Sequence, residues 1–94
     1  MKNNNIIKLR KKLDLLDNKF LNLIKKRSLL VEMILKQKTS KNQIINRKRI
    51  KIILKNIRKK SLIKKIDKNL TERIWKAIIK ESINYEFKNF KKKK

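Results

Sequence analysis

Apolar residues recur at intervals of three and four along the first part of the chain. The series is Ile6, Leu9, Leu13, Leu16, Phe20, Leu23, Leu30 and Ile34. Residues spaced in this way lie on one face of an α-helix. The pattern therefore predicts an amphipathic helix from about residue 5 to residue 40, roughly 50 Å long at 1.5 Å per residue.

Two shorter helices are predicted after polar breaks at residues 39–43 (TSKNQ) and 64–67 (KKID). The second helix covers about residues 46–60, and its inward positions are Ile50, Ile53 and Ile57. The third extends to about residue 90, and its inward positions are Ile74, Trp75, Ile78 and Ile79. The NLTE segment at 69–72 resembles a capping box, with Asn69 as the N-cap of this helix.

The predicted lengths do not suit a compact monomer. The first helix is about as long as the other two combined, so part of its apolar face would extend beyond the helices of its own chain. A second copy could cover that face in an intertwined helical homodimer. We expect one all-α domain over residues 1–94, structured from about 5 to 90, with a solvated basic tail at 91–94.

The composition excludes several kinds of site. The 94 residues include no Cys, His, Gly or Pro. Disulfides, thiolate metal sites and histidine general bases are therefore ruled out. A P-loop and a dinucleotide-binding turn both need glycine. We expect no metal and no cofactor.

No apolar run is long enough for a signal peptide core or a membrane span, so a cytoplasmic protein is expected.

The net charge of +24 arises from 31 Lys and Arg against 7 Asp and Glu. Such a charge favours nucleic acid or an anionic membrane as a partner, and non-specific nucleic-acid binding is open on this ground. The basic residues, however, are spread along the whole chain. The abundance of Lys, Asn and Ile also fits compositional drift in an A+T-rich genome, so the two explanations both stand.

Two cations interrupt the apolar face of the first helix. Arg27 and Lys38 lie 11 positions apart, which places them within about 20° of one direction and about 16 Å apart along the axis. Each could extend its charged end to water while its aliphatic stem packs. Alternatively, the two side chains could converge on an anion.

The other two helices also carry polar groups beside their apolar positions. Arg49 precedes Ile50, and Ser82 and Glu86 form an i,i+4 pair in the third helix. Each has an ordinary structural explanation when taken singly. Together they suit a polyanion whose carboxylates are held by guanidinium groups. With no nucleophile beside a base, chemistry would come from positioning and electrostatic stabilisation.

These pieces occur in one order. The segment from Leu9 to Arg27 reads LR..LD.LD..FL.LI..R, and a Lys follows eleven residues later. An Arg stands in the second helix, and IIKES is followed by a Glu four residues after the Ser. In this order and spacing the chain resembles the small all-α chorismate mutases over nearly its whole length.

The resemblance implies an intertwined homodimer that converts chorismate to prephenate in phenylalanine and tyrosine biosynthesis. That reaction is pericyclic and needs no covalent catalysis. By the same resemblance, Arg27 and the partner chain's Arg10 would each hold a substrate carboxylate. Lys38 would contact a carboxylate and the ether oxygen whose bond breaks, and Arg49 would orient the site. Ser82 would add a hydroxyl, and Glu86 would face the ether oxygen.

The implied role of Glu86 depends on whether its carboxyl group is protonated. The ether oxygen gains negative charge in the transition state and needs hydrogen-bond donors. An ionised Glu only accepts, so Glu86 must be protonated to help. Desolvation favours the protonated form, whereas Arg27 and Lys38 oppose it.

Two other substrate-binding positions depart from the family. Asn46 stands where an Asp is common. Ile50 stands where a Glu commonly accepts a hydrogen bond from the substrate hydroxyl, and an Ile side chain cannot accept one.

Two alternatives to an active mutase therefore stay open. One is a basic helical nucleic-acid-binding protein, although aromatics for stacking are few and no groove-reading motif is present. The other is a mutase-like dimerisation module with impaired catalysis.

Overall fold

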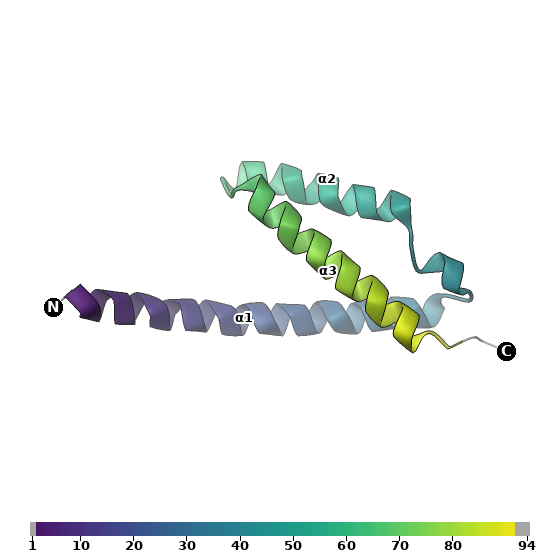
Figure 1. Ribbon diagram of the computed structural model, residues 1–94, viewed down its shortest axis with the longest axis horizontal. Coiled ribbons are helices and arrows are strands. Elements are labelled where there is room, and N and C mark those ends of the chain that lie inside the picture. The colour runs from purple at the N-terminus through teal and green to yellow at the C-terminus, as the bar shows by residue number, and fades with distance from the viewer. Residues whose placement is uncertain (1, 92–94) are drawn as a thin grey trace. The chain divides into compact units, whose positions relative to one another are not determined.

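The computed structural model describes residues 2–91 as an all-α chain. Its elements are α1 (Lys2–Gln37), a short 3₁₀ helix η1 (Lys41–Gln43), α2 (Arg47–Ile63) and α3 (Lys68–Asn89), labelled in Figure 1. The described residues contain no strand. The predicted all-α, three-helix class is confirmed. The first helix ends three residues earlier than predicted, and the second extends three residues further.

The chain divides into two units, and each is described by itself. The first holds α1 up to Val31, and the second begins at Glu32 and includes the end of α1, η1, α2 and α3. In the predicted basic tail, residue 91 lies outside any helix, and residues 92–94 are outside the described part of the chain.

The apolar face predicted for the first helix is exposed. Its eight members range from 45% exposed at Phe20 to 61% at Leu23. The sequence pattern therefore identified a real helix face, and the side chains on that face are exposed.

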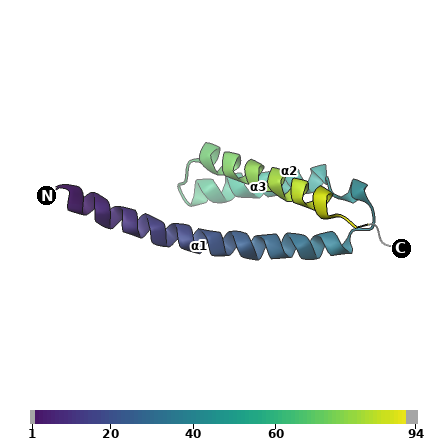
Figure 2. The same ribbon diagram turned by 60° about the horizontal axis from the view of Figure 1, so that its bottom comes forward.

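In the second unit, α2 and α3 pack side by side as an antiparallel pair, as both Figure 1 and Figure 2 show. The turn between them begins with a Schellman motif, in which Ile66 N donates to Ser61 O and Lys65 N donates to Leu62 O. This motif usually places glycine at the left-handed position. Here Lys65 takes that conformation, with φ of 59°, because the chain has no glycine to use.

The predicted capping box at the start of the third helix is wrong. Asp67 is the N-cap of α3, and its side chain accepts from Asn69 N at 2.9 Å. Asn69 thus lies inside the first turn of the helix. Glu72 does not reach back to the cap; it accepts from Arg58 on α2 at 2.8 Å. The sequence placed the start of α3 within two residues but assigned the cap to the wrong side chain.

Burial in the described residues is limited. Leu35, Ile44 and Ile79 are the buried apolar side chains. The other predicted inward positions of the second and third helices are half-buried: Ile50, Ile53, Ile57, Ile74, Trp75 and Ile78. The inward faces were therefore placed correctly, but most of their residues keep some exposed surface.

Two hydroxyl groups connect α2 to α3 in the interior. Ser61 Oγ donates to Ile57 O at 2.7 Å and lies 2.6 Å from Thr71 Oγ1. Thr71 Oγ1 has only longer contacts to backbone carbonyls, 3.3 Å to Lys68 O and 3.4 Å to Asp67 O. We therefore infer that Ser61 donates to Ile57 O and that Thr71 is the donor of the short hydroxyl bond. Both residues are buried, so the bond between the two hydroxyls lies in the interior.

We predict that Thr71→Val, which keeps the shape of the side chain but removes the donor, lowers the free energy of unfolding by about 1–2 kcal/mol. The loss arises because a buried Ser61 oxygen loses its donor. Urea unfolding at one fixed protein concentration measures it. Adding Ser61→Ala should cost much less than Ser61→Ala does alone, because the two hydroxyls act as a pair. Additive losses would contradict this assignment.

Candidate active site

The second unit brings together two of the predicted site residues. Lys38 Nζ donates to Glu86 Oε1 at 2.7 Å, across 48 positions of sequence. The Lys38 side chain is 18% exposed and the Glu86 side chain 8%. A partly desolvated pair of this kind interacts more strongly than a surface ion pair, because less water screens the two charges.

Local structure fixes Lys38 in this position. It is the first residue after α1, and its backbone N donates to Leu35 O at 3.1 Å. The Gln43 side chain then accepts from Thr39 N at 2.6 Å and from Ser40 N at 3.0 Å. These bonds close the segment into a compact turn, and Ile44 behind it is only 3% exposed. Lys38 therefore starts from a defined backbone.

Glu86 belongs to α3, one helical turn after Ser82. Glu86 is buried and Ser82 is half-buried, so the predicted i,i+4 pair lies on the inner side of α3. Every buried side-chain nitrogen and oxygen in the described residues has a hydrogen-bond partner. Glu86 is thus a satisfied acceptor in this arrangement, and Lys38 is its donor.

Asn46 has a structural role that the sequence analysis did not assign to it. It is the N-cap of α2, and its side-chain oxygen accepts from Arg49 N at 3.0 Å. Asn caps helices about as well as Asp. The cap also fixes the start of the helix on which Arg49 stands. The Arg49 side chain itself is exposed.

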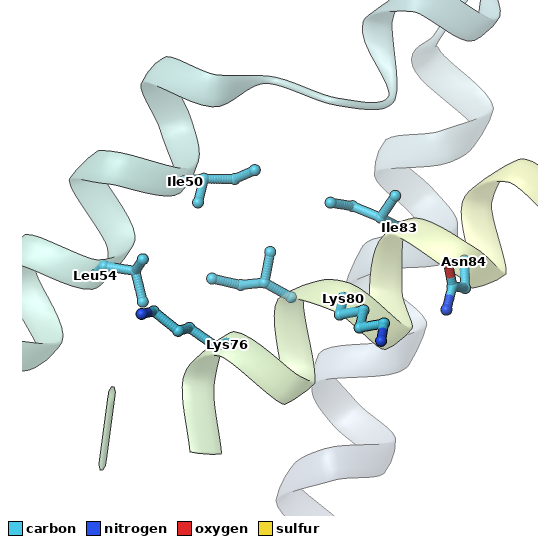
Figure 3. Close-up of a pocket in the computed structure, with 7 residues that line it drawn as sticks. Ile50, Leu54, Lys76, Lys80, Ile83 and Asn84 are labelled. Atoms are coloured by element: carbon cyan, nitrogen blue, oxygen red, sulfur yellow. The ribbon is translucent and has the colours of Figure 1, made fainter. Parts of the chain in front are cut away.

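A mostly apolar groove lies between α2 and α3. Its volume is about 330 Å³, and it is lined by Ile50, Leu54, Lys76, Ile79, Lys80, Ile83 and Asn84. Figure 3 shows Ile50 and Leu54 projecting from α2 toward α3, with Ile83 opposite. Ile50 is therefore part of an apolar wall, and this position offers the groove no hydrogen-bond acceptor.

The sequence analysis missed most of this lining. Lys76 and Lys80 stand one turn apart on α3, as do Ile79 and Ile83. The i,i+4 spacing of both pairs was visible in the sequence. What the spacing alone does not give is which side of α3 meets α2.

The first unit carries the other two predicted residues. Arg10 is exposed and Arg27 is half-buried, and both lie on α1. Their predicted roles toward substrate stay predictions.

The donor set limits the chemistry available. Among the described residues, no three acidic side chains gather closely enough to hold a metal ion. No helix in that part of the chain is both long and apolar enough to cross a bilayer. The second unit does supply an ammonium, a carboxyl group and a half-buried hydroxyl, from Lys38, Glu86 and Ser82, and none of these three residues lines the apolar groove. Groups of these types can bind an anion and stabilise charge on oxygen.

Comparison with known families gives one match. The model of the family described as chorismate mutase type II matches residues 9–87. Comparisons with curated proteins and with solved structures found no match. The matched range contains all eight predicted site residues, from Arg10 to Glu86, and covers most of the 94-residue chain. The all-α fold agrees with it. The chain therefore belongs to the chorismate mutase type II family.

Proposed function

We propose that this protein is a chorismate mutase that converts chorismate to prephenate in the biosynthesis of phenylalanine and tyrosine. Family membership supports the reaction class. The observation that carries the proposal is the partly buried Lys38–Glu86 pair. These are the two residues that the family resemblance assigns to the ether oxygen of the substrate, and they come from segments 48 positions apart.

The reaction suits a site without nucleophile or metal. One carbon–oxygen bond of the ether breaks while one carbon–carbon bond forms, and no atom enters or leaves. Catalysis then consists of holding the substrate in its reactive shape and stabilising the oxygen as it gains charge. In this proposal, Arg27 and the partner chain's Arg10 hold the carboxylates, Arg49 orients the site and Ser82 contributes its hydroxyl.

The Lys38–Glu86 bond adds a second effect of protonation at position 86. An ionised Glu86 accepts from Lys38 and so competes with the substrate carboxylate for the ammonium. A protonated Glu86 gives up that charge-assisted bond and offers an O–H donor. The first change leaves Lys38 available to a substrate carboxylate, and the second provides a donor to the ether oxygen. Loss of the proton therefore opposes activity in two ways.

We further propose that the active form is a homodimer. The exposed apolar face of α1, from Ile6 to Ile34, supports this. Monomeric soluble proteins rarely leave an apolar patch of this extent in water, and such patches mark interaction sites. A second copy of α1 offers a complementary surface and supplies the Arg10 that the site requires from another chain.

We predict that the purified protein removes chorismate, measured as the decay of its absorbance, and that Arg27→Ala lowers kcat/KM at least about 30-fold. Truncating one side of a buried ionic contact costs about 2–5 kcal/mol, and each 1.4 kcal/mol is a factor of ten in rate. Arg73→Ala is the control, because Arg73 is exposed on α3 and has no proposed role. A dimer with no activity would identify a dimerisation module instead.

We predict that kcat/KM falls as pH rises and that Glu86→Gln flattens this dependence. The carboxamide of the Glu86→Gln variant donates a hydrogen bond at every pH and carries no charge to hold Lys38, so the ammonium can bind the substrate. The pH profile of kcat/KM measures both effects. Glu81→Gln is the matched control, because Glu81 is an exposed acid on the same helix and its neutralisation should leave the slope unchanged. Equal slopes for the native protein and the Glu86 variant would refute the proposed role of Glu86.

We predict that the native protein sediments with twice the mass of one chain and that the double variant Leu16→Asp, Phe20→Asp sediments as a single chain without mutase activity. Two carboxylates on the exposed apolar face would be buried unpaired in the interface, which is strongly unfavourable. Sedimentation equilibrium gives the mass. Lys25→Asp is the control, since Lys25 is exposed on the opposite side of the helix from that face. A double variant that remains dimeric would show that another surface forms the dimer.

A further inference from the structure

The second helix, α2, contains many basic residues and no acidic ones. The 17 residues of α2 include eight Lys and Arg and no Asp or Glu. By contrast, α1 and α3 each contain three acidic residues. Drift toward Lys codons raises the number of cations everywhere, but it does not by itself remove every acid from one helix. The second helix is thus the most concentrated run of uncompensated positive charge among the helices described.

Most of these cations share one face. Arg47, Lys51, Lys55 and Lys59 follow each other at intervals of four, and Lys48 lies beside them. At 100° and 1.5 Å per residue, the five occupy an arc of about 120° over a length of about 18 Å. All five side chains are exposed. We call these five residues the α2 cationic face.

The opposite side of α2 is already occupied. Ile50 and Leu54 project toward α3 and line the groove with Ile79 and Ile83 (Figure 3). Packing against α3 therefore turns the α2 cationic face toward solvent. A sixth cation, Arg58, lies within the same arc. It pairs with Glu72 on α3 and lowers the pKa of that carboxyl through their hydrogen bond. In the described part of the chain, none of the five has an acidic side chain within 4.0 Å.

We propose that the α2 cationic face binds the phosphodiester backbone of nucleic acid without regard to base sequence. Double-stranded DNA carries about one negative charge per 1.7 Å of its axis, so an 18 Å length of duplex carries about ten phosphates on its two strands. A row of cations that repeats about every 6 Å can meet several of them at once. Because α2 contains no aromatic residue, it cannot stack on bases, and its binding rests on the phosphates alone.

An anionic membrane fits this surface less well. Helices that bind membranes in the interfacial plane insert an apolar face among the lipids and keep their cations at the headgroups. The apolar face of α2 contacts α3 instead. The proposal is also independent of mutase activity, since none of the five residues is among those assigned to chorismate.

The test is fluorescence anisotropy with the full chain and labelled 20-base-pair duplexes of DNA and of RNA, each in two sequences, at 50–300 mM NaCl. The test variant is Lys51→Gln, Lys55→Gln, Lys59→Gln. The matched control is Lys19→Gln, Lys80→Gln, Lys88→Gln, which removes the same charge from exposed positions on α1 and α3. Circular dichroism checks the helical content of both. If the test variant unfolds, Lys51→Gln and Lys59→Gln are measured singly.

For the native protein we expect log K against log salt to have a slope of about −4.5, which is 0.9 for each of five phosphate contacts. The test variant should lose about 2.7 of that slope and at least about tenfold in affinity at 100 mM salt, and each single variant about 0.9 of the slope. The control should change affinity by less than about threefold. Affinity should be equal for the two sequences of each duplex.

Three results would overturn the proposal. Equal weakening by the two triple variants would show that only the net charge of the protein matters. No binding to either duplex at 100 mM salt would show that the surface is simply solvated. Tighter binding to vesicles containing phosphatidylserine than to the duplexes, lost in the test variant, would assign the α2 cationic face to membranes.

Discussion

The ion pair between Lys38 and Glu86 joins the end of α1 to the last turns of α3. Both side chains have given up most of their contact with water, so neither charge can be left alone without a large desolvation cost. Several nearby features serve this pair: the turn closed by Gln43, the buried Ile44 behind it and the inward direction of Glu86 on α3. The same cost makes the pair useful in a binding site. In the proposed site, a substrate carboxylate that takes Lys38 from Glu86 would replace the partner that the lysine loses. Glu86 would then have to be protonated, because an ionised Glu86 would be left without its partner.

A second constraint comes from the lack of glycine and the small amount of burial. The turn between α2 and α3 places Lys65 in a left-handed conformation, which costs a residue with a Cβ atom about 1 kcal/mol or more. The described residues bury three apolar side chains. Apolar burial contributes about 25 cal/mol per Å², so this interior alone is a modest source of stability. The exposed face of α1 is the larger reserve of apolar surface, and the proposed self-association would bury it.

The sequence predicted the fold more completely than the site. Helical periodicity located all three helices, because it depends only on which residues are apolar. The prediction was wrong at the start of the third helix, because a single side chain determines the cap there: Asp67 is the N-cap, and not Asn69. The family pattern placed Lys38 and Glu86 at the same substrate oxygen, but it did not predict the bond between them. No local rule relates residues so far apart in the sequence. The groove lining was missed because it depends on the rotation of α2 against α3, which the period of neither helix fixes.

The two departures from the family pattern differ in physical kind. Asn46 retains a side-chain oxygen, and it accepts from Arg49 N as a capping Asp would. The start of α2 is therefore kept without a negative charge. Ile50 instead replaces a polar group by an apolar one, and it packs in the wall formed with Leu54, Ile79 and Ile83. This residue is compatible with the fold, since a carboxylate without a partner would be unfavourable in that apolar wall. Neither departure therefore disturbs the structure of α2. In the proposed site, Ile50 would offer the substrate hydroxyl no acceptor, so recognition would rest more heavily on the carboxylates and the ether oxygen.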